Sequence, residues 1–346
     1  MLRKLRRFVG TILKSLHIDY TKTKIYKSYK HRVEREEKIL QQDMLISLYQ
    51  LPVNKVINNM QNKNEIVGFI FSFDRAFQLY SLIKSIDEKF VTKMPIYIFY
   101  RASNDKHQAA YHEVFSKFSN LQIVPILQKS KESFREDYLQ ALDSISTENI
   151  IFFVDDIVLT ESFDYADVKN LPLNVFTPTL RLGANTTYSY TMDCESKTNK
   201  LLDNNLFKKY TNIDDKLFWQ WKDGVADWAY SISVDGSIFD FQEILLLSHN
   251  TDYTSPNVYE YYLNSLYSSL YSHKIAVAYK KSKLVNMPIN KVQQDKFNVN
   301  RSGNIDTNYL LDLWNQGYEM DLSHLYGYVN NSPHEEIELK IVKRES

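Results

Sequence analysis

The amino-acid sequence predicts a mixed α/β protein with an open, mostly parallel sheet and helices on both faces. Short apolar runs alternate with helical patterns between residues 61 and 160, which is typical of β-α-β units. The run 150–154 holds five consecutive β-branched or aromatic residues, as expected of a strand buried on both faces. Two acids, Asp155 and Asp156, follow it at the point where ligands bind in open α/β sheets.

Each predicted element has its own sequence signal. Apolar runs indicate strands in the first half at 66–71, 96–100, 121–125 and 150–154. Helical spacing of apolar residues indicates helices around 79–86, 106–118 and 133–145. The second half is less regular, with strands expected at 175–178 and 275–278, a weak last strand within 334–343, and helices at 258–272 and 307–316. Ser255, Pro256 and Asn257 form a helix-start signal for the first of these two helices.

The chain divides by pattern into three parts: a basic N-terminal helix with a connector (1–60), a first half (61–160) and a second half (161–346). Residues 1–17 have an apolar stripe among basic residues, and residues 1–40 hold 12 Lys/Arg against 4 Asp/Glu. Such a helix can lie on an anionic membrane, so we expect residues 1–32 to contact the inner face of the cell membrane from the cytoplasm. The alternative is a helix that docks on its own domain.

Composition excludes several classes of protein. The 42 basic and 42 acidic residues balance, which gives no electrostatic argument for nucleic acid. Cys194 is the single cysteine, so no intramolecular disulfide can form. Neither GxGxxG nor GxxxxGK[ST] occurs among the 8 glycines, which argues against a dinucleotide Rossmann domain and a P-loop NTPase.

Three sequence motifs in the first half carry a resemblance to a known family. A strand leads through Ser-Phe-Asp-Arg (72–75) into a helix, a second strand ends in Tyr100-Arg101, and the fourth ends in Val-Asp-Asp (154–156). Over roughly residues 64–160 this resembles the nucleotide-sugar-binding half of GT-A-fold glycosyltransferases. The resemblance implies a GT-A-like fold and a Mn²⁺ or Mg²⁺ ion bound at the acids. The chain departs from the family's acidic signature at Val154, where the first acid is missing.

Donor-site and metal residues follow from this resemblance. Asp156 is expected to contact the metal, and Asp155 to contact the metal, ribose or water. His334 is expected to complete the metal shell, as a late histidine does in some members. The remaining donor-site residues are expected to bind the nucleotide or the diphosphate, with the acceptor as a second ligand considered for Arg181: Asp74, Arg75, Tyr100, Arg101, Asp105 and Arg181. The structural alternatives are turn residues for Asp74 and Asp105, and ion pairs for Arg75 and Arg181.

Two acids are candidates for the general base that an acceptor hydroxyl needs. Asp227 is preferred, because it lies between Trp221 and Trp228 and indole rings can stack on sugars. Glu260, early in its predicted helix, is the second candidate. The structural alternatives are a loop acid or helix cap for Asp227, and a favourable charge near a helix N-terminus for Glu260.

The resemblance, together with these candidate residues, implies a metal-dependent, inverting glycosyltransferase, hexosyl or related, of bacterial surface-polysaccharide biosynthesis. Its donor would be a nucleotide-sugar, a UDP-sugar in the first instance, and its acceptor a glycan or a lipid-linked hydroxyl. Two alternatives stay open: a sugar nucleotidyltransferase, and a non-catalytic protein of the same fold that binds a glycan or a partner. A nucleotidyltransferase would usually carry a Gly-rich loop with a basic residue after the first strand, where this chain has Ser-Phe-Asp-Arg.

Overall fold

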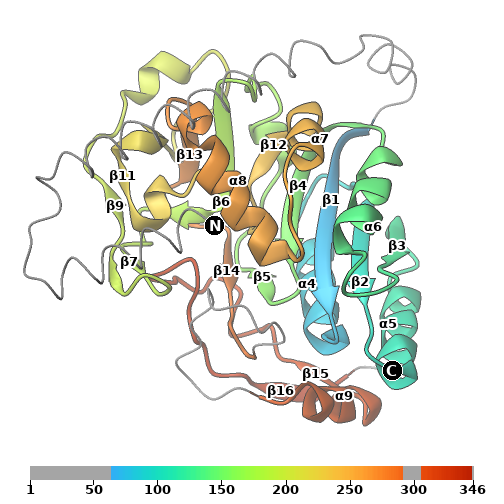
Figure 1. Ribbon diagram of the computed structural model, residues 1–346. Coiled ribbons are helices and arrows are strands. Elements are labelled where there is room, and N and C mark those ends of the chain that lie inside the picture. Colours follow the sequence, from blue (N-terminus) through green and yellow to red (C-terminus); the bar gives the residue numbers. More distant parts are fainter. Residues whose placement is uncertain (1–63, 291–304, 345–346) are drawn as a thin grey trace, which may run out of the picture. The chain divides into compact units, whose positions relative to one another are not determined.

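The computed structural model describes residues 64–290 and 305–344 (Figure 1). The predicted amphipathic helix at 1–17, and the membrane contact expected of residues 1–32, lie outside this range. Within the described ranges no helix combines the length and apolar character required to cross a bilayer.

A five-stranded sheet forms the centre of the fold. Its order is β12-β4-β1-β2-β3, with β1 to β4 parallel and β12 antiparallel to β4. The strands are β1 (Asn64–Phe73), β2 (Ile96–Arg101), β3 (Ile123–Leu127), β4 (Thr147–Val154) and β12 (Ile238–Asp240). The prediction of a mostly parallel α/β sheet is confirmed.

This strand order creates a topological switch point between β1 and β4. The chain moves from β1 to β2 and β3 on one side, and then returns to place β4 on the other side of β1. The strands β2 and β4 therefore lie on opposite sides of β1. In open α/β sheets such a point is where the crevice for ligands forms.

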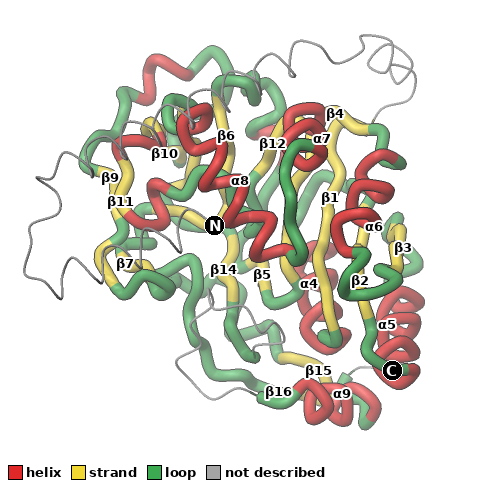
Figure 2. Tube along the Cα trace, in the orientation of Figure 1, coloured by secondary structure: helices red, strands yellow, loops and turns green. Residues whose placement is uncertain are grey.

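Helices cover both faces of this sheet (Figure 2). On one face α4 packs against α5 and α9, and on the other face α6 packs against α7, which also contacts β4. Tyr138 of α6 meets Tyr259 of α8 edge-on, with 5.2 Å between ring centroids. The helices are α4 (Ala76–Lys89), α5 (Asp105–Lys117), α6 (Phe134–Asp143), α7 (Phe241–His249), α8 (Pro256–Tyr271) and α9 (Thr307–Asn315).

Side chains alternate between the two faces of the sheet along each strand, which gives helices an apolar surface to pack against on both faces. Successive side chains of a strand point to opposite faces. Ile66 and Ile70 of β1 accordingly join the core that includes α4. Phe69 and Phe71 lie on the other face, each with its ring centroid within 5.4 Å of that of Tyr138 in α6. Both faces are apolar, as the continuous apolar runs in the sequence predicted.

A second, three-stranded sheet has the order β10-β13-β6 and carries the tryptophan cluster. Its strands are β6 (Phe176–Gly183), β10 (Lys216–Gln220) and β13 (Ile275–Tyr279). Trp219, Trp221 and Trp228 pack on its face and are at most 5% exposed. The expectation that Trp221 and Trp228 stack on a sugar is therefore wrong, because their rings are already covered by protein.

Short strand pairs and 3₁₀ turns complete the described structure. β14 pairs with β5, β16 with β15, β8 with β7 and β11 with β9. The bounds of the pairs are β5 (Ile157–Leu159), β14 (Leu284–Asn286), β15 (Tyr318–Met320), β16 (Ile341–Lys343), β7 (Tyr188–Ser189), β8 (Cys194–Glu195), β9 (Lys197–Thr198) and β11 (Gly224–Val225). The 3₁₀ turns are Tyr165–Asp167, Asn204–Phe207, Trp221–Asp223 and Ala226–Ala229. The β14–β5 pair brings Asn286 opposite Ile157, directly after the two acids.

Gly236 occupies a turn that only glycine fits well. Its φ of +72° is in the left-handed region, and an added Cβ would lie 2.3 Å from Cδ2 of Leu284. We expect Gly236→Ala to lower the free energy of unfolding by about 2 to 4 kcal/mol, through backbone strain and overpacking together. Gly317 is the matched control, because its φ is +79° and nothing lies within 4 Å of an added Cβ. Urea denaturation of both alanine variants should show the smaller loss, about 1 to 2 kcal/mol, for Gly317; equal losses would contradict the packing argument.

Candidate active site

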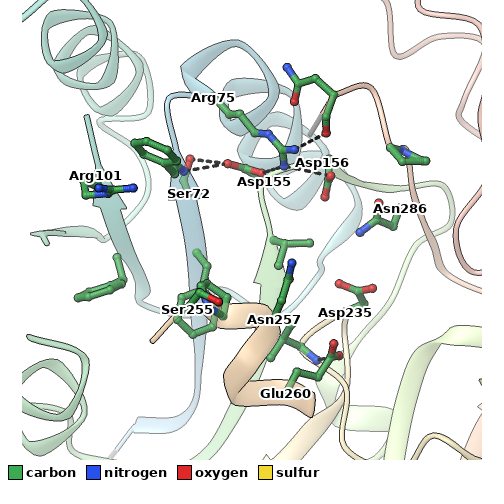
Figure 3. A pocket seen from close by; sticks show the side chains of 18 of the residues that line it. Ser72, Arg75, Arg101, Asp155, Asp156, Asp235, Ser255, Asn257, Glu260 and Asn286 are labelled. Carbon is green, nitrogen blue, oxygen red and sulfur yellow. Dashed lines mark hydrogen bonds and ion pairs between the residues drawn. The ribbon is translucent and has the colours of Figure 1, made fainter. Parts of the chain in front are cut away.

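A cavity of about 410 Å³ opens at the switch point (Figure 3). One wall is made by the residues that follow β1 and β4, among them Arg75, Asp155 and Asp156. The opposite wall is made by the N-terminal turn of α8 and by the turn at Val234 and Asp235. The volume lies in the range of small-molecule sites in proteins, about 300–1,000 Å³.

The first wall holds an acid–arginine cluster of Arg75, Asp155 and Asp156. Nη1 of Arg75 lies 2.8 Å from Oδ1 of Asp155 and 3.1 Å from Oδ2 of Asp156. Oδ2 of Asp155 accepts hydrogen bonds from Oγ of Ser72 (2.7 Å) and from the backbone N–H of Phe73 (3.3 Å). The carboxyl ends of two neighbouring parallel strands supply these groups, which is why residues 80 positions apart meet here.

Burial sets the proton affinity of this cluster. It raises the pKa of Asp156 to about 6, and the charge of Arg75 counteracts part of that rise. Burial alone would lower the pKa of Arg75, but Asp155 and Asp156 raise it above its ordinary value. The guanidinium is therefore a permanent cation between the two acids.

The second wall holds the Glu260 cluster, which consists of Asp235, Glu260 and His334. Nε2 of His334 donates to Oδ2 of Asp235 at 3.0 Å, and Oε1 of Glu260 accepts from the backbone N–H of Val234 at 2.9 Å. Figure 3 shows Asp235 and Glu260 side by side, across the cavity from Arg75, with the Asn257 side chain pointing into the space between. The three residues come from a turn, a helix and the C-terminal segment.

The Glu260 cluster combines groups with opposite pKa shifts. Burial and the nearby charge of Asp235 raise the pKa of Glu260 to about 7. Burial would also raise the pKa of Asp235, but its hydrogen bond from His334 lowers it overall. Burial would lower the pKa of His334, yet the same hydrogen bond and the charge of Asp235 raise it. Glu260 is thus the acid of this cluster that can take up and release a proton near neutral pH.

Helix α8 places Glu260 because its start is fixed by capping. Oγ of Ser255 accepts from the N–H of Val258 at 3.3 Å, and Pro256 occupies the first turn. The predicted helix start is confirmed. Glu260 follows one turn after the cap, so its side chain lies beside that of Asn257 on the cavity side. Nδ2 of Asn257 is buried and has no hydrogen-bond partner among the described residues.

Two further cations line the cavity near the ends of β2 and β3. The guanidinium carbon of Arg101 lies 3.8 Å from the ring centroid of Phe73, a cation–π contact that holds the side chain over the ring. Lys131 and the amide of Gln128 line the cavity beside it. Arg101 is the last residue of β2 and Lys131 lies after β3, so both cations stand at the same edge of the sheet as Arg75.

Five of the predicted site residues are not part of the cavity lining. Asp74 accepts from the N–H of Ser103 at 2.8 Å and so ties the exits of β1 and β2 together. Tyr100 is 4% exposed and accepts from Gln108 at 2.9 Å, and Asp105 begins α5 with an exposed side chain. Arg181 and Asp227 pair with each other, as described next.

Arg181 and Asp227 form a buried ion pair. Nη1 of Arg181 lies 3.0 Å from Oδ1 of Asp227, with the two side chains 2% and 8% exposed. Nη2 of Arg181 also donates to the backbone carbonyl of Asp227 at 3.3 Å. The preferred base of the sequence analysis is therefore engaged with a cation away from the cavity lining, whereas the second candidate, Glu260, lines the cavity.

Most of the ligand atoms of the predicted Mn²⁺ or Mg²⁺ site already have hydrogen-bond partners in the protein. Both oxygens of Asp155 and Oδ2 of Asp156 already accept hydrogen bonds from protein groups, and Nε2 of His334 is bonded to Asp235. Oδ1 of Asp156 is the remaining carboxylate oxygen, buried and without a hydrogen-bond partner in the described part of the chain. The described residues include no group of three or more His, Cys, Asp or Glu that could hold an ion. The side chains of Asp155, Asp156 and His334 do not fit one bridging metal ion in this arrangement.

Several cavity residues were missed by sequence reasoning. Asp235, Asn286 and Asn290 line the cavity, and no sequence motif singles them out. The backbone N–H of Met287 bonds to the carbonyl of Asp156 at 2.8 Å, which brings this segment to the end of β4. The one local signal for Asp235 was the pair Asp235-Gly236 between apolar stretches, which indicates a turn and not a binding site.

Comparisons with known proteins add a partial likeness in structure. No protein-family model matches the sequence, and no curated protein matches it. The structure is similar to one described as "Crystal structure of S. aureus TarS", with a TM-score of 0.40 and 12% identity over 64% of this chain and 36% of that chain. It is also similar to one described as "WbbM bifunctional glycosytransferase apo structure", with a TM-score of 0.35 and 11% identity over 62% of this chain and 39% of that chain. The chain thus spans less than half of the length of either protein.

Proposed function

We propose that this chain is a glycosyltransferase that moves a sugar from a nucleotide-sugar to the hydroxyl of a glycan or lipid-linked acceptor. One observation supports this above the others. A single cavity at the switch point has cations on one wall and, on the opposite wall, a carboxylate whose pKa is about 7. Binding an anionic leaving group and accepting a proton from an incoming hydroxyl are the two tasks of sugar transfer.

The donor would occupy the side of the cavity with the positive charges. Arg101 and Lys131 line this side, and their charges suit the diphosphate of a nucleotide-sugar, a UDP-sugar in the first instance. The buried amide of Asn257, which lacks a partner among the described residues, is suited to donate to a sugar hydroxyl. The sugar would then lie between the diphosphate and Glu260.

Glu260 is proposed as the general base of an inverting reaction. Its carboxylate takes the proton of the acceptor hydroxyl as the hydroxyl oxygen forms a bond to the anomeric carbon. The bond between that carbon and the diphosphate oxygen breaks, and the nucleoside diphosphate leaves with the electron pair. Cations that line the cavity stabilise the charge that develops on the leaving group.

The biological setting is also part of the proposal. We place the chain in bacterial surface-polysaccharide biosynthesis, with an acceptor presented at the cytoplasmic side of the membrane. The basic residues within 1–32 suit an anionic lipid surface, where a lipid-linked acceptor would be found.

A thermal-shift screen tests the donor site. UDP, GDP, CMP and dTDP are each added to the full chain in buffer with Mg²⁺ and Mn²⁺, so that a metal requirement cannot hide binding. A ligand at a hundred times Kd stabilises the native state by about 2.7 kcal/mol, which raises the melting temperature by several degrees. We expect one nucleotide to raise the melting temperature by this amount. The matching nucleotide-sugar should then release nucleoside diphosphate in the presence of an acceptor.

Arg101→Gln is the test variant and Arg135→Gln the control. Arg135 binds the backbone carbonyls of His249 and Thr251 and does not line the cavity. The shift should be lost in the first variant and kept in the second. No shift with any nucleotide in a folded sample would favour the non-catalytic alternative. Formation of pyrophosphate from a nucleoside triphosphate and a sugar phosphate would favour the nucleotidyltransferase.

A further inference from the structure

The position of Arg75 between the two acids has a consequence for how the cavity binds its ligand. In proteins a divalent cation usually binds a diphosphate ligand through one or two carboxylates, which supply hard oxygen atoms. Here Nη1 of Arg75 is within 3.1 Å of an oxygen of each acid. The guanidinium therefore occupies the space where a cation shared by Asp155 and Asp156 would lie.

Arg75 is held in this position from several sides. Its Nη2 donates to the backbone carbonyl of Asn290 at 2.5 Å, and its backbone N–H donates to the hydroxyl of Tyr111 at 3.1 Å. The side chain is 10% exposed, and those of Asp155 and Asp156 are 4% and 11% exposed. Separating such a buried pair is strongly unfavourable, because it leaves a buried charge without its partner. A metal ion that bridged the acids would have to bring about that separation.

Asp155 has little coordination capacity left in this arrangement, because three of the roughly four lone-pair positions of its carboxylate are in use. Its two oxygens accept three hydrogen bonds, from Arg75, from Ser72 and from the backbone N–H of Phe73. Asp156 contributes one remaining oxygen, Oδ1. An ion bound by that oxygen alone would stand beside a guanidinium, and the repulsion between the two cations would weaken its binding.

Other side chains of the same cavity carry the positive charge that would neutralise a diphosphate. Arg101 and Lys131 line it beside the aromatic rings at the ends of β1 and β2. Their charged groups can reach phosphate oxygens without disturbing the acid–arginine cluster, because neither is bonded to its acids. The planar guanidinium of Arg101, held over the Phe73 ring, is suited to bind two phosphate oxygens at once.

We infer that Arg75 is the resident counter-ion of Asp155 and Asp156, and that the cavity binds a nucleoside diphosphate without a divalent metal ion. This inference rests on the proposed function, since it concerns the donor site of the same cavity. Arg101 and Lys131 are the residues that neutralise the diphosphate. The acids then serve to fix Arg75 and the turn after β1, and Val154 is compatible with a site that needs no third acid.

Isothermal titration calorimetry of the full chain tests this directly. The probe is the nucleoside diphosphate that gives the largest shift in the thermal screen, titrated in EDTA, in Mg²⁺ and in Mn²⁺. We expect the three values of Kd to agree within about threefold, a difference of less than 1 kcal/mol. Binding that needs the metal, with Kd at least ten times higher in EDTA, would overturn the inference but leave the proposed function intact. Absence of binding in all three buffers would overturn both.

Direct metal binding gives an independent readout. Titration of Mn²⁺ followed by electron paramagnetic resonance should show weak binding to the wild-type chain and at least tenfold tighter binding to Arg75→Gln, in which the acids lose their counter-ion. Arg135→Gln is the control and should bind Mn²⁺ as weakly as the wild type. Tight Mn²⁺ binding by the wild type that is lost in Asp156→Asn would overturn the inference. The wild-type measurements decide the question even if Arg75→Gln does not fold.

Discussion

Glu260→Gln should lower kcat by about 10²- to 10⁴-fold, the usual contribution of a general base, while nucleotide affinity changes little. Glutamine keeps the oxygen that accepts from the backbone N–H of Val234, so the local structure should persist. It cannot take a proton from the acceptor hydroxyl. Steady-state kinetics with saturating donor, together with calorimetric titration of the nucleotide, separate the loss of the base from a loss of binding.

The dependence of the reaction rate on pH gives a second test of Glu260 as the general base. Burial raises the pKa of Glu260 to about 7, and a base acts only when it is ionised. The wild-type rate should therefore rise with pH and level off above about 7, and this rise should be absent from Glu260→Gln.

Two further variants show whether the assignment is correct. Glu338→Gln changes the same functional group on an exposed residue outside the cavity and should leave kcat unchanged. Asp227→Asn tests the base that the sequence analysis preferred. If Asp227→Asn removes the rise with pH and Glu260→Gln keeps it, the base is Asp227 and our assignment is wrong.

Arg181→Met should destabilise the protein by about 3 to 5 kcal/mol, because it leaves the buried carboxylate of Asp227 without its counter-ion. Burial would lower the pKa of Arg181, but Asp227, Asp235 and Glu260 raise it, so the guanidinium stays charged and serves all three acids. Urea denaturation measures the loss. The variant should lower the free energy of unfolding more than it weakens nucleotide binding, since neither Arg181 nor Asp227 lines the cavity.

A double variant separates a structural role from a role in binding. Arg181→Met combined with Asp227→Leu removes both charges, and an apolar pair of similar volume should recover most of the lost stability. If Arg181→Met instead keeps the wild-type stability and weakens nucleotide binding, Arg181 contacts the donor diphosphate, as the sequence analysis expected.

Much of the fold could be predicted from local sequence patterns. The runs 66–71, 96–100 and 150–154 lie within β1, β2 and β4, because a strand buried on both faces requires a continuous apolar run. The signal at Ser255 and Pro256 located the start of α8, because capping is a local interaction. The sequence also placed Arg75, Asp155 and Asp156 near one edge of the sheet, since parallel strands end there, but it assigned Arg75 to the donor and not to the two acids.

The sequence by itself determined which elements form and which residues stand at the carboxyl edge of the sheet, because these depend on residue spacing along the chain. Only the tertiary structure decided how those residues are paired. It placed the guanidinium of Arg75 between the two acids and paired His334 with Asp235, about a hundred residues away. It also buried the tryptophans beside Asp227 in the hydrophobic core. Burial and charge partners are long-range properties, and they decide which acid can exchange a proton. Glu260 has a raised pKa in the cavity, whereas Asp227 is engaged with Arg181 outside the lining.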